Sequence, residues 1–260
     1  MNLIVCMKQV PSSNEVRMDP KTKTIIRDAK SAVWNPFDRS ALEVAVLLKE
    51  QLGGHITALS MGIPDTSRLL EEAISCGADE ALLLSDRAFA GADTLATSYA
   101  LSLGVKEIGP YHLILCGKMA VDGDTAQIGP ELAETLGIPH ITNVTQIVFA
   151  SEKELIVSRK IDGASQLVQV TLPALLTVVK EIAQPRLPSI ASILHAKETP
   201  CTVRNAQNLQ ADTTRTGLLG SPTQVVKTFT PPPKQSGVTL SAKPDQAAKE
   251  IAALFEEVKR

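Results

Sequence analysis

One stretch of the chain decides its fold, and it runs His112-Leu113-Ile114-Leu115-Cys116-Gly117-Lys118-Met119-Ala120-Val121-Asp122-Gly123-Asp124-Thr125-Ala126-Gln127-Ile128-Gly129-Pro130. Its first residues form a brief, mostly apolar run, which is typical of a strand that a parallel sheet buries on both faces. A loop of small and polar residues follows, and helical spacing resumes at Glu131–Leu136. A strand, a loop and a helix in this order predict one unit of an α/β fold.

The same alternation of short apolar runs and helical spacing fills the first 180 residues. The other short apolar runs are Leu3–Met7, Ile56–Met61 and Ala81–Leu84. Helical spacing of the apolar side chains occupies three segments, each followed by a glycine: Asp38–Leu52, Ser67–Cys76 and Asp93–Ile108. This rhythm predicts a doubly wound α/β domain with a mostly parallel sheet.

Beyond residue 140 the pattern changes to longer strands and a hairpin. We expect strands at Ile141–Ala150, Glu154–Arg159 and Ser165–Thr171. The pair Asp162-Gly163 separates the last two, and an Asp-Gly pair between two strands is a strong hairpin signal. A final apolar run, Leu175–Val179, is expected to return to the sheet.

The chain from Glu198 onward loses its periodicity and gains prolines, among them Pro231-Pro232-Pro233. Apolar side chains share one face again only near Asp245–Lys259, which predicts a closing helix. A segment as long as 198–242 without structure of its own is uncommon inside a compact domain. We therefore interpret residues 1–197 as an α/β domain. Residues 198–260 are interpreted as an extended arm with its closing helix, which needs another surface to lie on.

Composition excludes several classes of protein. The formal net charge is −2 and aromatic residues make up 3%, so the chain lacks the basic surface and the stacking platforms of a nucleic-acid-binding protein. No apolar run approaches the roughly 18 residues of a membrane span, and the first residues do not resemble a secretory signal. Four widely spaced cysteines (Cys6, Cys76, Cys116, Cys201) favour reduced thiols and a cytoplasmic protein.

The loop that follows Cys116 is the strongest candidate for a binding site. In a doubly wound sheet, ligands bind at the carboxyl ends of the strands, and free N–H groups at a helix start suit a phosphate. Thr125 and Gln127 add side-chain donors. The helix start has two readings: Asp124 caps a helix that contains Pro130, or Gly129 precedes a helix with Pro130 at its first position. The alternative to a binding site is an ordinary loop between a strand and a helix, with a good N-cap residue for the helix, which explains the same sequence pattern.

Two other segments have both a structural and a functional interpretation. In Trp34-Asn35-Pro36-Phe37-Asp38, Asn35-Pro36 is a turn signal and Asp38 suits a plain helix cap. The segment Gln184–Lys197 combines two prolines with aliphatic residues, which suits a core-packed connection or a partner-binding loop and helix. No motif of a catalytic site is present, and the four histidines lack the spacing of metal ligands.

Together these segments resemble the beta subunit of electron transfer flavoprotein, a family that includes the related Fix proteins. The resemblance covers most of the chain as far as about residue 200. It rests on the following pieces: Val5-Cys6-Met7-Lys8-Gln9-Val10, Asn35-Pro36-Phe37-Asp38, Gly77-Ala78-Asp79-Glu80, the loop Gly117–Pro130, Ile161-Asp162-Gly163, Leu172-Pro173-Ala174 and Pro185–Lys197.

The resemblance implies a fold and a set of cofactor-binding residues. It implies that this chain has the adenine nucleotide alpha hydrolase-like fold. It also implies a partner, an alpha subunit that binds FAD and on which the C-terminal arm and helix of this chain pack. The positions that match the family's adenine pocket are Cys6, Asn35, Asp38 and Met61. Pro36 and Phe37, between Asn35 and Asp38, are also expected to bind the cofactor. Its phosphate-binding loop matches Ala120 to Ile128, with Asp122, Gly123, Asp124, Thr125, Ala126 and Gln127 most directly placed. No residue of this subunit need act as an acid or a base.

The family also implies a choice of cofactor in this subunit. Ordinary members hold a structural AMP, whereas electron-bifurcating members hold a second FAD that takes electrons from NADH. The sequence Asp122-Gly123-Asp124-Thr125-Ala126-Gln127 resembles the loop of the bifurcating members. In those members electrons are split between a high-potential acceptor and a low-potential acceptor such as ferredoxin. A different class of protein, a non-redox nucleotide-binding module of the stress type, shares the fold. That module needs neither the arm nor the aliphatic segment.

The segment 184–197 matches the family's recognition loop, which docks on a partner dehydrogenase. Ile190 stands at the place of the aliphatic anchor, and Leu187, Ile193 and Leu194 are its aliphatic neighbours. Ala191 replaces the proline that is common there, so the partner is left open between two flavin-dependent classes. These are acyl-CoA dehydrogenases and 2-hydroxyacid dehydrogenases such as lactate dehydrogenase.

Overall fold

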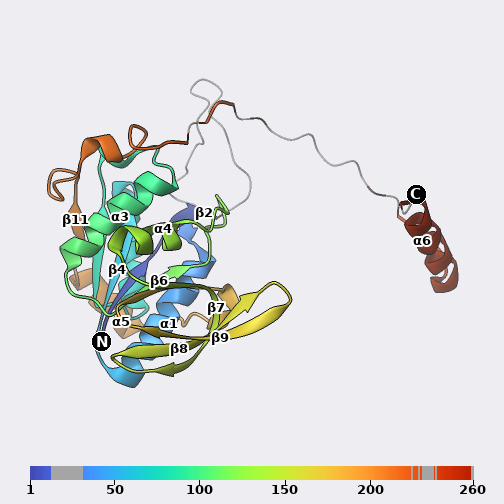
Figure 1. Cartoon of the computed structure of the whole chain (residues 1–260), viewed down its shortest axis with the longest axis horizontal. Coiled ribbons are helices and arrows are strands. Elements are labelled where there is room, and N and C mark those ends of the chain that lie inside the picture. Colours follow the sequence, from blue (N-terminus) through green and yellow to red (C-terminus); the bar gives the residue numbers. More distant parts are fainter. Residues whose placement is uncertain (13–31, 224, 228, 230–236, 238, 259–260) are drawn as a thin grey trace. The chain divides into compact units, whose positions relative to one another are not determined.

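The structure is a computed structural model that describes residues 1–12, 32–223, 225–227, 229, 237 and 239–258 (Figure 1). The internal contacts divide the chain into two units, Met1–Gln224 and Val225–Arg260. The second unit contains helix α6 (Pro244–Val258), which confirms the predicted closing helix as far as Val258. The predicted proline run Pro231–Pro233 and the last predicted helical residue, Lys259, lie outside the described residues.

A nine-stranded sheet forms the centre of the first unit. Its strands lie in the order β11-β5-β4-β1-β6-β10-β7-β8-β9, and they are parallel from β11 to β7 and antiparallel from β7 to β9. A separate two-stranded antiparallel ribbon pairs β2 (Gln9–Pro11) with β3 (Ala32–Trp34). The strands of the large sheet are β1 (Asn2–Cys6), β4 (His55–Met61), β5 (Glu80–Leu84), β6 (Leu113–Gly117), β7 (His140–Ala150), β8 (Glu154–Ile161), β9 (Ala164–Thr171), β10 (Ala174–Val178) and β11 (Thr202–Arg204).

Helices cover both faces of this sheet, which confirms the doubly wound α/β class (Figure 1). Two separate apolar clusters lie between the sheet and the helices. Side chains of α1 and α2 build one cluster, and side chains of α3 and α4 build the other. The helices of this unit are α1 (Pro36–Leu52), α2 (Ser67–Ser75), α3 (Thr94–Ile108), α4 (Ile128–Leu136) and α5 (Ile190–Glu198).

The alternation of side chains along β1 explains why its sequence is a continuous apolar run. Leu3 and Val5 point into the cluster beneath α1 and α2, whereas Ile4 and Cys6 point into the cluster beneath α3 and α4. A strand in the middle of a two-faced sheet therefore needs an apolar side chain at every position. The same requirement holds for β6, whose Leu113, Ile114 and Leu115 are fully buried.

The antiparallel extension of the sheet also follows the prediction. Strand β8 ends at Ile161 and β9 begins at Ala164, so Asp162 and Gly163 form a two-residue hairpin loop. Gly163 has φ +72°, a conformation that glycine adopts without a steric penalty. Strand β10 returns to the parallel region between β6 and β7, as expected from the run Leu175–Val179.

The arm begins later than the sequence indicated, because residues 198–223 belong to the first unit. Thr202–Arg204 forms β11, which pairs in parallel with β5 at the edge of the sheet. Ala206 and Leu209 are buried against the α3 side of the sheet. The boundary proposed at residue 197 is therefore wrong for this part of the chain, because an edge strand of three residues is too short to show a periodic pattern.

This boundary predicts a difference between two shortened chains. A chain that ends at Gln224 is expected to keep a higher melting temperature than one that ends at Thr199. The shorter chain loses β11, uncovers β5 and removes the buried Leu209, and losing one large core side chain alone costs about 2–5 kcal/mol. Calorimetric melting of both chains measures the difference. Equal melting temperatures would contradict the position of the boundary.

Candidate functional site

The order of the strands reverses between β1 and β6, and this reversal defines a candidate ligand crevice at the carboxyl edge of the sheet. From β1 the chain moves through β4 to β5 on one side, and it then returns to place β6 on the other side of β1. The two strands pair in parallel, with Cys6 opposite Cys116 near their carboxyl ends. Ligands of open α/β sheets bind at such a reversal of strand order. The candidate site is therefore defined by topology before any side chain is considered.

A buried carboxylate accepts hydrogen bonds from the backbone just after β1 and from the last residue of β6. Asp38 lies in the first turn of α1 and is 6% exposed. Its Oδ2 accepts a hydrogen bond from the backbone N–H of Lys8 at 2.7 Å, and its Oδ1 accepts one from the N–H of Gly117 at 3.1 Å. Burial raises the pKa of this carboxyl to about 7, although the two backbone N–H groups and the side chain of Asn35 favour its charged form.

Asp38 is thus not the plain helix cap that the sequence suggested. The N-cap residue of α1 is Asn35, and its side chain caps no N–H of the helix. Gly117 explains why the carboxylate fits so closely, because a Cβ at residue 117 would collide with the Asp38 Oδ1 atom and with Phe37. A residue larger than glycine would push β6 away from the start of α1.

Asn35 connects the start of α1 to the loop after β6. Its side chain is buried, and its Nδ2 donates to the carbonyl of Met119 at 2.9 Å. Its Oδ1 accepts from the N–H of Val121 at 3.3 Å, and its own N–H donates to the carbonyl of Lys8. The buried amide satisfies its polar groups through the backbone of the loop, so it fixes the path along which the loop leaves the sheet.

The loop after β6 is exposed from Val121 to Gln127. Asp124 and Ala126 adopt left-handed conformations with φ +50° and +55°. Non-glycine residues seldom adopt this conformation, and residues that do are frequent in ligand-binding segments. Helix α4 begins at Ile128 with Gln127 as its N-cap residue, so neither predicted helix start, with Asp124 or Gly129 as the cap, is correct.

Gly123 occupies open space in this loop. No atom lies within 4 Å of a Cβ placed on it, and it is absent from the residues with positive φ in the described part of the chain. The protein itself therefore does not require a glycine here. The contact of Gly123 with a cofactor stays a prediction, and the open space around it leaves room for one.

The structure brings all of the predicted cofactor-binding positions to one edge of the sheet. Met61 ends β4, the neighbour of β1 on the side away from β6, and it is half-buried. Cys6 ends β1 and is buried, whereas Pro36, Phe37, Ala120 and Ile128 are half-buried. Their contact with a cofactor remains a prediction.

Three further residues belong to this edge, and they are Lys8, Thr94 and Glu131. Lys8 reaches from the end of β1 to Asp122 of the loop, with its Nζ 2.7 Å from Oδ1. The hydroxyl of Thr94, the first residue of α3, lies 3.0 Å from Glu131 Oε1 and 3.3 Å from Gln127 Oε1, and its single proton can be donated to either oxygen. These contacts join segments that are distant in the sequence, so no local pattern marks them.

The donor set at this edge suits the phosphate of a nucleotide. Exposed backbone at the start of α4, the Thr125 hydroxyl and the Lys8 ammonium group all favour a negative charge. Acids also stand close by: Asp122 pairs with Lys8, and Asp124 lies in the same loop. Glu131 keeps a buried Oε2 without a hydrogen-bond partner among the described residues. Burial raises the pKa of Glu131, which lowers its tendency to carry a charge beside an anion.

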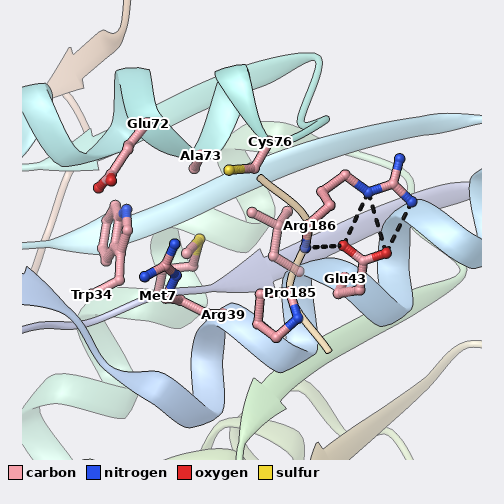
Figure 2. A pocket seen from close by; sticks show the side chains of 10 residues that line it. Met7, Trp34, Arg39, Glu43, Glu72, Ala73, Cys76, Pro185 and Arg186 are labelled. Carbon is pink, nitrogen blue, oxygen red and sulfur yellow. Dashed lines mark hydrogen bonds and ion pairs between the residues drawn. The ribbon is translucent and has the colours of Figure 1, made fainter. Parts of the chain in front are cut away.

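Two pockets lie away from this edge. One is lined by residues of α1, α2 and the segment with Pro185 and Arg186 (Figure 2). The other lies at the amino edge of the sheet, between Asn2, Glu80 and Arg204. Neither is at the reversal of strand order, so topology favours the more open carboxyl edge as the ligand site. Across the described ranges, no cluster of three or more His, Cys, Asp or Glu side chains is arranged for a metal ion, and no helix is long and apolar enough to cross a membrane.

The segment 184–197 exposes the aliphatic side chains that the sequence singled out. Leu187 is 87% exposed and Ile190 is 80% exposed, and Ile193 and Leu194 are also exposed. Helix α5 begins at Ile190, and the Ser189 hydroxyl caps it by accepting from the N–H of Ser192. The exposed side chains therefore gather on a capped helix start, and a core-packed connection is excluded for these four residues.

Fold and site together define a doubly wound α/β protein with a candidate ligand site at the reversal of its strand order. The sequence pattern of the electron transfer flavoprotein domain matches residues 22–209. The chain therefore belongs to the electron transfer flavoprotein family, and its similarity to curated relatives identifies it as a subunit of the beta type. Beta subunits of this family pair with an alpha subunit, and the family associates with flavin and nucleotide.

Three relatives indicate how close the similarity is. The beta subunit of electron transfer flavoprotein from Thermoanaerobacterium thermosaccharolyticum is 44% identical over 252 residues, which cover 96% of each chain. Subunit CarD of the caffeyl-CoA reductase-Etf complex from Acetobacterium woodii is 44% identical, over 93% of this chain and 92% of the relative. Protein FixA from Bradyrhizobium diazoefficiens is 40% identical, over 98% of this chain and 91% of the relative.

Asp38 predicts a pH dependence of stability. Folding raises the pKa of Asp38 from 3.8 to about 7. At a pH between these two values, Asp38 keeps its proton in the folded chain but has lost it in the unfolded chain. The resulting stabilisation is complete below about pH 4 and is lost as the pH rises through about 7. Urea unfolding between pH 4.5 and 8 measures this slope. The variant Asp38→Asn is expected to lack it and to be less stable, because one amide oxygen cannot accept both backbone N–H groups. A slope that persists in Asp38→Asn would contradict the assignment.

Proposed function

We propose that this subunit, paired with an alpha subunit, binds FAD in the crevice between β1 and β6 and takes part in electron bifurcation. In this proposal NADH donates the electrons, and ferredoxin and a flavin-dependent dehydrogenase are the partners of the complex. The observation that carries the proposal is the exposed loop Val121–Gln127, with two left-handed residues, directly before the N-terminus of α4. This arrangement offers backbone donors and free space to a phosphate-containing cofactor.

The residues of this chain would bind and orient the cofactor. The loop and the first turn of α4 would hold the phosphates, with Thr125 and Lys8 as further donors. Asn35 and Asp38 would keep the loop and the strand ends in place through the backbone bonds described above. Bound FAD supplies the redox chemistry, and the protein supplies position and electrostatics.

The relatives support the bifurcating form over the form with a structural AMP. The chain is about equally similar to an electron transfer flavoprotein beta subunit and to CarD, whose name describes a subunit of a caffeyl-CoA reductase-Etf complex. A reductase of a CoA thioester in that complex favours a partner of the acyl-CoA dehydrogenase class. The 2-hydroxyacid dehydrogenase class is the alternative.

Counting the cofactors of the purified heterodimer tests the proposal. Two FAD molecules per heterodimer are expected, measured by absorbance after denaturation together with chromatography of the released nucleotides. One FAD and one AMP would instead establish the ordinary carrier. A colourless homodimer of this chain would favour the non-redox nucleotide-binding module.

Gly123 provides a test of where the cofactor binds. The variant Gly123→Val is expected to lower the affinity for FAD by about tenfold or more, because a clash with a ligand costs about 1–3 kcal/mol. The melting temperature of the cofactor-free subunit should not change, since the added side chain meets open space. Gly123→Ala serves as the matched control and should cause a smaller loss. Full cofactor content in Gly123→Val would contradict the proposed position.

We further propose that Leu187, Ile190, Ile193 and Leu194 form the docking surface for the dehydrogenase. Their exposure supports this role, since large aliphatic side chains on a capped helix start bury little of themselves in their own subunit. An aliphatic anchor that becomes fully buried in a complex typically contributes about 2 kcal/mol or more.

The variant Ile190→Ala is expected to weaken binding to the dehydrogenase by about thirtyfold, while the melting temperature and cofactor content stay unchanged. Val203→Ala, at an exposed valine of β11, is the matched control and should leave the affinity unchanged. Calorimetric titration measures both. A large fall in melting temperature in Ile190→Ala would show that the side chain supports the core of this subunit instead.

A further inference from the structure

The backbone that carries Leu187 toward Ile190 has little support of its own. Residues 183–189 form neither helix nor strand. Among the described residues, no backbone-to-backbone hydrogen bond outside the regular elements involves residues 184–188. A segment of this kind would ordinarily sample many conformations, and each ordered residue costs about 1–2 kcal/mol of conformational entropy. Side chains must therefore hold the segment in place.

Arg186 holds the segment through Glu43 of α1 (Figure 2). The Arg186 backbone N–H donates to Glu43 Oε2 at 3.0 Å, and Nε donates to the same oxygen at 3.0 Å. Nη2 donates to Glu43 Oε1 at 2.9 Å, so both carboxylate oxygens are engaged by one residue. The carboxylate thus fixes the backbone and the side chain of Arg186 at once.

The burial of Glu43 distinguishes this ion pair from an ordinary surface pair, although the Arg186 side chain is 33% exposed. The Glu43 side chain is 9% exposed, whereas Glu50, which accepts from Arg186 Nη1 at 2.7 Å, is 55% exposed. Removing one partner of a buried pair leaves the other charge without compensation, but an exposed pair contributes little. Lysine cannot replace arginine here, because only the planar guanidinium engages both carboxylate oxygens.

The neighbours of Arg186 are fixed on both sides. Pro185 and Arg186 line a small pocket together with Trp34 and Cys76, so this part of the segment lies against α1 and α2 (Figure 2). Further along the chain, Ala196 of α5 is buried in the apolar cluster beneath α1 and α2. Leu187 and Ile190 lie between these two attachments and point their side chains to solvent.

We propose that Arg186 and Glu43 are positioning residues, which hold the docking surface in its binding geometry before the dehydrogenase arrives. The inference rests on the docking role proposed above for Leu187, Ile190, Ile193 and Leu194. A surface that is ordered in advance binds more tightly, because the complex does not have to pay for its ordering. Arg186 acts through the placement of the aliphatic side chains and need not touch the partner itself.

Three variants of the heterodimer test the positioning role against a purified flavin-dependent acyl-CoA dehydrogenase from the same organism. Arg186→Lys and Glu43→Gln are expected to weaken binding by about tenfold and to leave the cofactor content unchanged. Glu50→Gln, the matched control at the exposed partner, should change the affinity by less than about twofold. Equal affinities in all three variants and the parent would overturn the inference.

A double variant separates positioning from general stability. If Arg186 acts by placing Ile190, Arg186→Lys should cost almost no further affinity once Ile190→Ala is present. Independent effects that multiply in the double variant would overturn the inference. An unchanged affinity in Ile190→Ala would instead overturn the docking role, so the two failures are distinguishable.

Hydrogen exchange gives a second measurement, which remains informative if Arg186→Lys folds poorly. The amide of Arg186 should be protected in the parent heterodimer, because it donates to Glu43. In Glu43→Gln its protection should fall at least tenfold, with the amides of β6 unchanged. A fast-exchanging Arg186 amide in the parent would contradict the positioning role.

Discussion

The buried carboxylate of Asp38 is the contact on which the carboxyl edge of this protein depends. It accepts from the backbone of Lys8, shortly after β1 ends at Cys6, and from the backbone of Gly117 at the end of β6, while its own backbone belongs to the first turn of α1. Three elements are thereby held at one point. Desolvation opposes the charge and raises the pKa to about 7, so the protonation state of this carboxyl is sensitive to pH. The same arrangement leaves no room for a side chain at residue 117.

The loop after β6 takes its shape from this fixed point. Asn35 binds the backbone on both sides of Ala120, which directs the loop outward. The following residues are then free to face solvent and to adopt the left-handed conformations seen at Asp124 and Ala126. A rigid base and an open loop are a suitable combination for a cofactor, because the base provides position and the loop provides donors. The family's association with flavin and nucleotide agrees with this division.

Much of the fold follows from the sequence, because buried central strands require apolar residues at every position, as in Leu3–Met7. Contacts over long distances in the sequence were not accessible in this way. Asp38 has the local pattern of a helix cap, yet its partners lie 30 and 79 residues away. One of the two helix starts left open by the sequence had Gly129 precede α4, but Gly129 lies within the helix, where the absence of a Cβ lets the helix approach Thr177 of β10. The short strand β11 had no periodic signal, since only its pairing with β5 defines it.

The two proposed sites use the same helix in different ways. The start of α1 supports the crevice through Asp38, and its next turn holds the docking surface through Glu43. The central claim is that the crevice between β1 and β6 is the cofactor site. A crystal structure of the heterodimer purified with its own cofactors tests this most directly. The account predicts an adenine nucleotide at the carboxyl edge, with a phosphate at the N-terminus of α4. A crevice closed by side chains, with the nucleotide bound elsewhere on this subunit, would contradict it.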